Sequence, residues 1–179
     1  MENIAGSKKT RRRLQRQVSR KYQMNKKGDR YCKTGNLIKS EKRLLRINHR
    51  LTNIRANHVH QATAAIIKRK PSFICLEDLN VQGMMKNKHL SEKVQEQNLY
   101  EFRRQIEYKA NWAKITVVIA DRWYPSSKTC IKCGYMKKDL NLSDRTYVCP
   151  YCGNVIDRDF QAAMNLKRYG EAELFQSAS

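Results

Sequence analysis

The sequence predicts an α/β protein with a cysteine-rich insertion and a basic region before the α/β part. Two apolar runs typical of buried strands, Phe73 to Leu76 and Ile115 to Ala120, flank a helical pattern. A strand, a helix and a strand in this order predict a parallel pair joined by a right-handed crossover. Two CxxC pairs follow the second run, and Lys and Arg dominate the first 70 residues.

The two CxxC pairs have the spacing of a structural zinc site. Fifteen residues separate them, and the four cysteines are Cys130, Cys133, Cys149 and Cys152. Four thiolates grouped two and two close tetrahedrally around one Zn²⁺ and leave no position for a catalytic water. A glycine follows each pair, as a tight metal-binding turn requires. The alternatives are two disulfides or four buried free thiols.

The positive charge is concentrated in one part of the chain. Lys and Arg number 37 against 16 Asp and Glu, and residues 1–70 hold 21 basic and 3 acidic side chains. This excess predicts a polyanionic partner, with nucleic acid favoured over a membrane surface, because no apolar run approaches the ~20 residues that span a bilayer. The first residues lack a hydrophobic signal core, so we expect a reducing cytoplasmic location with Cys32 and Cys75 as free thiols.

Residues 1–39 are predicted to form a basic, partly disordered arm. The first ten residues are expected to be disordered, 11–24 to form a helix on the apolar positions Leu14, Val18 and Tyr22, and 25–36 to form a loop. Ser40 is predicted to cap a long helix that ends near Lys68. The expected nucleic-acid-binding residues are Arg11, Arg12, Arg13, Arg16, Arg20, Lys21, Arg43, Arg46 and Arg50. His49, His58 and His60 lack partners at metal-ligand spacing.

The α/β core is predicted over 40–121 and 154–170, with the zinc ribbon at 122–153 and a frayed tail at 171–179. The stretch after Asn80 is expected to be a loop, and Asn98 to cap the helix between the strands with Glu101 three residues on. Asp157 or Asp159 is expected to open the final helix.

Two carboxylates are candidates for metal-ion catalysis. Glu77 follows the first strand, and Asp159 lies on the final helix, whose small alanines allow close packing on the sheet. Carboxylate oxygens suit Mg²⁺, and paired Mg²⁺ ions activate phosphodiesters. Asp121 also ends a strand but is the weaker candidate. The solvated or capping roles common for Glu and Asp are the alternative.

Five blocks of the chain resemble TnpB-type (OrfB) proteins of insertion sequences. They read ICLEDLNVQGMMKN, EFRRQIEYKANW, RWYPSSKTCIKCG, LSDRTYVCPYCG and DRDFQAAMNL, in this order. The resemblance implies an RNase H-like (RuvC-like) nuclease fold and RNA-guided DNA endonuclease activity with Mg²⁺, DNA and a guide RNA. It further implies that Glu77 and Asp159 match the second and third catalytic carboxylates, and that the family is ancestral to type V CRISPR effectors.

The departures from the family pattern lead to three functional hypotheses. The first catalytic Asp of the family, in a block resembling GIDLG, has no counterpart here, and Gln161 replaces an Asn of the DRDxNAA pattern. The first hypothesis is therefore a C-terminal portion with an incomplete RuvC-like core, a transposition protein that binds nucleic acid and does not cleave alone. The second is a nuclease subunit completed by another chain or a full-length homologue. The third is a zinc-ribbon DNA-binding regulator of transposition.

Overall fold

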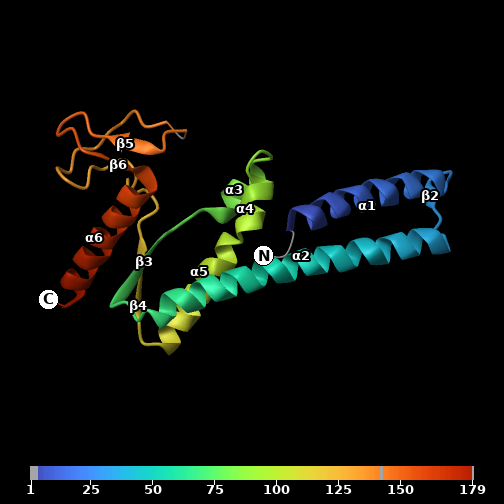
Figure 1. The fold of residues 1–179 in the computed structure, drawn as a ribbon, viewed down its shortest axis with the longest axis horizontal. Coiled ribbons are helices and arrows are strands. Elements are labelled where there is room, and N and C mark those ends of the chain that lie inside the picture. The colour runs from blue at the N-terminus through green and yellow to red at the C-terminus, as the bar shows by residue number, and fades with distance from the viewer. Residues whose placement is uncertain (1–3, 142, 179) are drawn as a thin grey trace. The chain divides into compact units, whose positions relative to one another are not determined.

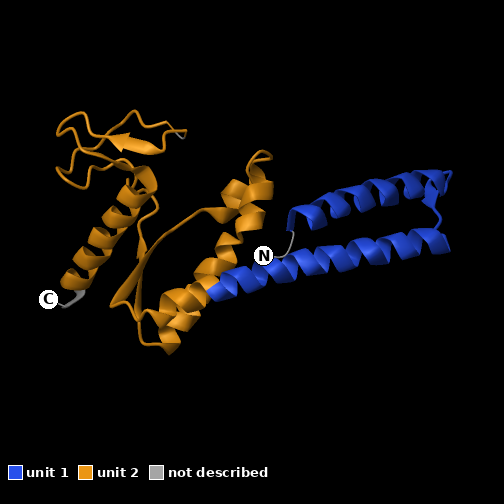
Figure 2. Cartoon of the chain, viewed as in Figure 1, with its two compact units in different colours: residues 1–61 blue, residues 62–179 orange. Residues whose placement is uncertain are grey.

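The computed structural model describes residues 4–141 and 143–178 (Figure 1). The chain divides into two compact units, residues 1–61 and residues 62–179, coloured separately in Figure 2. The boundary falls inside the longest helix, α2 (Gly35–Lys68). No helix among the described residues is both long and apolar enough to cross a membrane.

The first unit begins with helix α1 (Ile4–Met24), which is longer than predicted. Leu14 and Val18 are buried on it, as expected from their spacing. The sequence predicts disorder for the first ten residues, whereas the structure has residues 4–10 in the helix; residues 1–3 lie outside the described part. Alanine and lysine favour helix in this stretch, and the helix needs only a few apolar residues once it packs on a neighbour.

A tight turn joins α1 to α2 and contains two short paired strands, β1 (Lys26–Lys27) and β2 (Arg30–Tyr31). The strands pair antiparallel, and Gly28 at the turn has φ +58°, a conformation that favours glycine. All four strand residues are exposed. The segment predicted as a loop is therefore a β-turn connection between two helices.

Polar contacts fix α1 against the start of α2. The Lys21 ammonium donates hydrogen bonds to the Asn36 carbonyl at 3.0 Å and to the Ser40 hydroxyl at 2.8 Å. The Tyr22 hydroxyl donates to the Glu41 carboxylate, which also pairs with Lys33 at 3.2 Å. These contacts hold the pKa of Glu41 below its usual value, chiefly through the Tyr22 hydrogen bond.

Two details of the α2 prediction are wrong. The helix begins at Gly35, and Ser40 lies inside it with its hydroxyl donating to the Asn36 carbonyl at 3.0 Å instead of capping the first turn. Leu51 is buried as predicted. Further along the helix the buried residues are Val59 and Thr63, and not the predicted His58 and Ala62. The predicted stripe of apolar positions advances in steps of three and four residues, whereas an α-helix has 3.6 residues per turn. Over about 25 residues the buried face of the helix therefore moves away from the predicted positions.

The second unit contains the predicted strand, helix and parallel strand. β3 (Phe73–Glu77) pairs with β4 (Thr116–Ala120) in parallel, with Phe73 opposite Thr116 and Glu77 opposite Ala120. Helix α5 (Leu99–Trp112) connects them and buries Ile106 and Ala110, two members of its predicted stripe. The strands are half-buried rather than fully covered.

The stretch predicted as a loop before α5 is helical. α3 (Val81–Lys86) starts at Asn80, whose side-chain oxygen accepts the Gly83 N–H at 2.9 Å, and α4 (Ser91–Gln97) follows. Asn98 has φ +54° and makes no side-chain cap, so the capping box predicted with Glu101 is wrong. Glu101 instead accepts hydrogen bonds from Arg104 and Gln105. Asn tolerates the left-handed conformation needed to join two helices.

The final helix α6 (Arg158–Ala178) packs on β3 and β4, and Figure 1 shows it beside them. Asp157 caps it, because its carboxylate accepts the Phe160 N–H at 2.9 Å. At Gly170 an added Cβ would lie 2.5 Å from a Phe73 ring carbon and 3.1 Å from the Cys75 Cβ, so glycine permits the close approach. The helix continues to Ala178, whereas the sequence predicts a frayed tail from residue 171.

The ribbon between β4 and α6 is built on a short antiparallel pair, β5 (Thr146–Val148) and β6 (Val155–Asp157). Its core consists of Cys130, Tyr147 and Cys149, with Leu140, Cys152 and Ile156 packed against it. The ribbon has so few apolar residues that it needs another source of stability.

A buried polar cluster joins the end of α2 to α5 within the second unit. The Lys109 ammonium donates to the Thr63 hydroxyl at 2.6 Å and to the Gln105 side-chain oxygen at 3.1 Å, and Thr63 donates to Gln105 at 3.0 Å. Burial lowers the pKa of Lys109, because the charged ammonium is removed from water. The hydrogen bonds from the Lys109 ammonium to Thr63 and Gln105 therefore offset part of the cost of burying its charge.

We expect Thr63→Val to destabilise the second unit by about 1–3 kcal/mol, the usual cost of removing one partner of a buried polar group. The substitution keeps the side-chain shape and removes an acceptor of Lys109. Urea unfolding measures the change in the free energy of unfolding. Thr52→Val is the matched control, because Thr52 is an exposed threonine of the same helix. Equal stability of the two variants would contradict the prediction.

Candidate functional site

The four cysteines meet at one point of the ribbon. Their Sγ atoms all lie within 4.8 Å of one another, with Cys130 and Cys152 at 3.7 Å and Cys133 and Cys149 at 3.6 Å. Zinc–sulfur bonds of roughly 2.3 Å in a tetrahedron place the sulfurs about 3.8 Å apart. A disulfide would bring two sulfurs to about 2 Å, and the four thiols are free, so the disulfide alternative is wrong.

The turns around the cysteines have the predicted form. Gly134 and Gly153 have φ +76° and +68°, and their N–H groups donate to the carbonyls of Cys130 and Cys149. Burial disfavours the Cys149 thiolate, but N–H groups of Cys152 and Tyr151 donate to its sulfur and lower the pKa of this thiol. The Tyr135 N–H donates to the Cys133 sulfur, but burial and the neighbouring thiols outweigh it and raise the pKa of Cys133. The donor set therefore fits a metal such as Zn²⁺ in a closed structural site.

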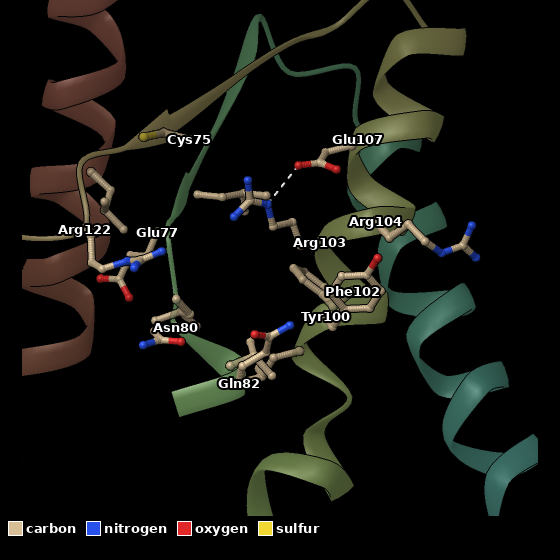
Figure 3. A pocket seen from close by; sticks show the side chains of 15 residues that line it. Cys75, Glu77, Asn80, Gln82, Tyr100, Phe102, Arg103, Arg104, Glu107 and Arg122 are labelled. Carbon is tan, nitrogen blue, oxygen red and sulfur yellow. Dashed lines mark hydrogen bonds and ion pairs between the residues drawn. The ribbon is translucent and has the colours of Figure 1, made fainter. Parts of the chain in front are cut away.

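Glu77 lies at the carboxyl end of β3, as predicted. The Ser126 hydroxyl donates to its Oε1 at 2.8 Å. Glu77 lines a cavity of about 720 Å³ beside β3, together with residues from α5 and Leu166 of α6 (Figure 3). The cavity lining is mixed. Its apolar part includes Leu76, Leu79, Val81, Leu99, Phe102 and Leu166, and its charged part consists of Glu77, Arg103, Arg104, Glu107 and Arg122.

Asp159 lies in the first turn of α6 and is exposed, with its Oδ2 3.9 Å from the Arg145 guanidinium. Leu166 lies seven residues later, so two helical turns place the two residues on the same side of α6. Because Gly170 contacts Phe73 and Cys75 while Leu166 lines the cavity with Glu77, α6 runs antiparallel to β3. Asp159 therefore lies beyond the carboxyl end of β3, on the cavity side of its helix.

The structure gives Glu77 and Asp159 different partners, Ser126 and Arg145. Within residues 4–141 and 143–178, the four cysteines are the only group of three or more His, Cys, Asp or Glu ligand atoms gathered closely enough for one ion. Oxygen ligands suit Mg²⁺, but two separated carboxylates are a partial donor set for it.

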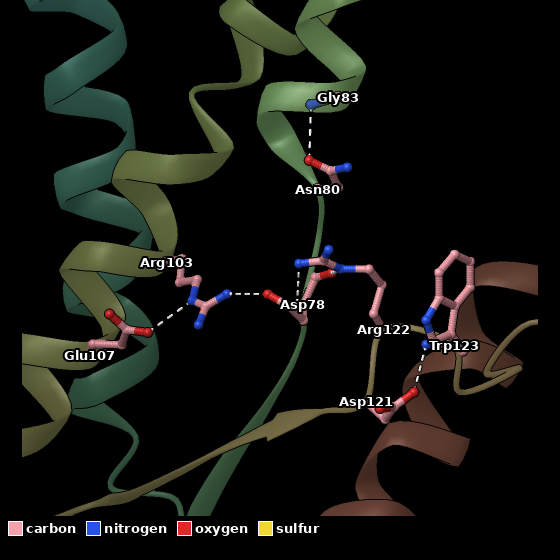
Figure 4. Close-up of polar contacts among 8 residues, drawn as sticks. All are labelled: Asp78, Asn80, Gly83, Arg103, Glu107, Asp121, Arg122 and Trp123. Carbon is pink, nitrogen blue, oxygen red and sulfur yellow. Dashed lines mark hydrogen bonds and ion pairs between the residues drawn. The ribbon is translucent and has the colours of Figure 1, made fainter.

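Asp78, next to Glu77, connects the end of β3 to α5 and to the residues after β4 through ion pairs. Its carboxylate accepts from Arg103 of α5 at 2.8 Å and from Arg122, which follows β4 (Figure 4). Arg103 also pairs with Glu107 at 2.9 Å. The hydrogen bonds from Arg103 and then Arg122 hold the pKa of Asp78 below its usual value. Asp121, the weaker carboxylate candidate, accepts the Trp123 N–H at 2.8 Å and so shapes the chain after β4.

The predicted nucleic-acid-binding residues all lie in the first unit. Arg13, Arg16 and Arg20 are exposed along α1, and Arg43 and Arg46 are exposed on α2. Arg12 and Arg50 are also exposed, whereas Arg11 is half-buried. Lys21 is occupied by Asn36 and Ser40, so it also serves the packing of α1 on α2.

Sequence reasoning missed Ser126 and Asn165, and it noted Gln161 only as a departure from the family pattern. Gln161 and Asn165 are buried polar residues on α6, and both donate to carbonyls of the segment that contains Ser126. Their spacing of four residues on a helix that packs on a sheet was the available signal, because a buried amide needs specific partners.

Comparison with known proteins gives a consistent result. Residues 100–166 match the Cas12f1-like, TNB domain family. A Streptomyces pristinaespiralis protein provisionally named RNA-guided DNA endonuclease is 34% identical over 160 residues, which cover 89% of this chain and 37% of that protein. Escherichia coli InsQ, with the same provisional name, is 30% identical over 177 residues, covering 90% of this chain and 41% of InsQ. The resemblance to TnpB-type proteins is confirmed.

The TnpB-type match is partial in length. The chain spans 37% and 41% of the two curated relatives. A cryo-EM structure of the Cas12f1–sgRNA–target DNA complex has a TM-score of 0.57 and 20% identity, covering 70% of this chain and 37% of the Cas12f1 chain. This likeness supports the α/β fold of the chain.

Proposed function

We propose that this chain is a TnpB-type protein that binds nucleic acid through its first unit and does not cleave DNA unaided. The distribution of charge carries the binding part of the proposal: residues 1–61 hold 18 Lys and Arg against 3 acidic residues. Exposed arginines on two helices neutralise phosphates and release counterions without reading bases. DNA and a guide RNA are the partners that the relatives' names suggest.

The carboxylates support the second part of the proposal. Glu77 and Asp159 would hold Mg²⁺. When two such ions are bound together, they polarise a phosphoryl oxygen of the substrate and activate the attacking water. The one Asp before Glu77 in the sequence is Asp29, and it is exposed in the turn between β1 and β2 of the other unit. Two carboxylates leave the paired ions with too little negative charge, so cleavage should be absent or very weak.

The test is a cleavage assay of the purified chain on supercoiled plasmid with Mg²⁺. We expect no nicking above the background of Glu77→Gln and Asp159→Asn variants. Asp139→Asn is a control for general loss of a carboxylate, because Asp139 is exposed in the ribbon and is not among the residues that line the cavity beside β3. Magnesium-dependent nicking by the chain alone, abolished by Glu77→Gln, would show that the proposal is wrong.

A second candidate function is a nuclease subunit completed by another chain. β3 pairs only with β4 in its two-stranded sheet among the described residues, and a cavity with apolar and charged lining lies beside β3. A strand edge with an adjacent cavity that has apolar side chains in its lining is suited to pairing with an added strand. Adding the remaining segment of a full-length relative, with its guide RNA, should then restore cleavage that Glu77→Gln removes. The absence of cleavage in that mixture would count against this candidate.

A further inference from the structure

The segment from Tyr124 to Thr129 connects β4 to the cysteine ribbon and is folded into a tight turn. The Pro125 carbonyl accepts the N–H groups of Lys128 and Thr129 and the Thr129 hydroxyl, at 3.0 to 3.1 Å. The Ser126 N–H donates to the Tyr124 carbonyl at 2.8 Å. The turn therefore has a defined backbone shape, with Ser126 near its centre.

Helix α6 holds this turn through buried side-chain amides. Asn165, with 2% of its surface exposed, donates to the Ser126 carbonyl at 2.7 Å and to the Thr129 carbonyl at 2.6 Å. Gln161, which is fully buried, donates to the Ser127 carbonyl at 3.3 Å. Buried amides of this kind tolerate little movement, because a displaced carbonyl would leave them without a partner.

The ribbon holds the same turn from the other side. Thr129 precedes the metal ligand Cys130 and forms a β-bridge with Met136, and the Lys128 carbonyl accepts the Lys137 N–H at 3.0 Å. The Tyr147 hydroxyl, from the ribbon core, also donates to the Lys128 carbonyl at 3.3 Å. The position of the turn thus depends on the folded ribbon.

Ser126 points from this turn to Glu77. Ser126 is buried, and its hydroxyl donates to Glu77 Oε1 at 2.8 Å. The two residues are 49 positions apart in the sequence. A hydroxyl donor on one carboxylate oxygen fixes the direction of the carboxylate and leaves the second oxygen for a cation. Ser127 is the natural comparison, because its backbone carbonyl, not its hydroxyl, makes the contact to α6.

We infer that Ser126 is a positioning residue for Glu77, and that the metal-bound ribbon and Asn165 set the location of Ser126. The significance for catalysis rests on the proposed role of Glu77 as a metal ligand. Whether or not Glu77 binds a metal, losing the Ser126 hydroxyl, or losing zinc from the ribbon, frees the Glu77 carboxylate. The ribbon would then act on the carboxylate site through a turn of six residues.

The experiment is carboxylate footprinting of the full chain with a water-soluble carbodiimide and glycine ethyl ester, read residue by residue by mass spectrometry. We expect Ser126→Ala to raise the modification rate of Glu77 by about three- to tenfold, because a hydrogen bond to a charged group is lost. Ser127→Ala should leave the rate unchanged. Ser126→Thr, which retains a hydroxyl, should restore a slow rate. Glu92 and Asp29, which are exposed as Glu77 is and lie outside the ribbon, serve as reference carboxylates in every sample.

A second arm tests the link to the ribbon. Removal of zinc from the wild-type chain with a chelator should raise the Glu77 rate, and the same treatment of Ser126→Ala should add little, because both act through one contact. An unchanged Glu77 rate in Ser126→Ala, equal effects at Ser126 and Ser127, or a uniform rise at all carboxylates would overturn the inference. None of these readouts requires cleavage, so failure of the proposed function would leave them interpretable.

Discussion

Replacing Cys149 by serine is expected to unfold the ribbon and to release the one zinc ion that we expect each chain to bind. Cys149 is 1% exposed and belongs to the ribbon core, which otherwise contains Tyr147 and few other buried apolar side chains. Structural zinc contributes about 10–16 kcal/mol to small zinc-binding peptides at neutral pH. No core of this size can replace such a contribution.

Metal content measured by mass spectrometry and hydrogen exchange over residues 128–157 test this expectation. Cys149→Ser should lose zinc and the protection of β5 and β6, while β3 and β4 retain most of theirs. Cys32→Ser is the control, because Cys32 is an exposed thiol outside the ribbon. A wild-type chain that folds fully without metal, or a Cys149→Ser variant with unchanged exchange, would contradict a structural metal site.

The ribbon was predictable from sequence because all of its determinants are local. The CxxC spacing, the glycines after each pair and the 15-residue separation specify one arrangement of four thiols, and the structure has that arrangement. The β3–α5–β4 unit was predictable for a similar reason: two short apolar runs around an amphipathic helix permit few topologies.

The errors have physical causes that local patterns do not contain. α3 and α4 have six and seven residues, fewer than two turns each, so no apolar periodicity can develop in them. Asn98 favours both an N-cap and a left-handed residue between helices, and the packing of α4 against α3 selects the second. The contact between Ser126 and Glu77 spans 49 residues, so it depends on how α6 and the ribbon pack.

Replacing Arg13, Arg16 and Arg20 together by glutamine is expected to weaken nucleic-acid binding and to reduce its salt dependence. The three arginines are exposed at positions i, i+3 and i+7 of α1, away from the buried Leu14 and Val18. Each phosphate contact contributes about 0.9 to the slope of log K against log salt for duplex DNA and about 0.7 for single strands. Loss of three contacts should therefore lower the slope by about 2 to 3.

Fluorescence anisotropy with a labelled duplex and a labelled single strand, over a range of salt concentrations, measures this slope. The matched control replaces Lys86, Lys88 and Lys93 by glutamine, which removes the same charge from exposed positions of the second unit. If binding reflected only the net charge of the whole chain, the two triple variants would weaken it equally. We expect the lysine variant to keep a slope within about one of the wild type.

The same titration separates the arm from the ribbon as the main binding element. A regulator that binds DNA through the ribbon would lose binding in Cys149→Ser, where the metal site is broken, and would keep it in the arginine variant. A chain that binds through its first unit would behave in the opposite way, because α1 and α2 contain none of the four clustered cysteines. Retention of the wild-type slope by the arginine variant, together with loss of binding in Cys149→Ser, would therefore reject the proposed role of α1.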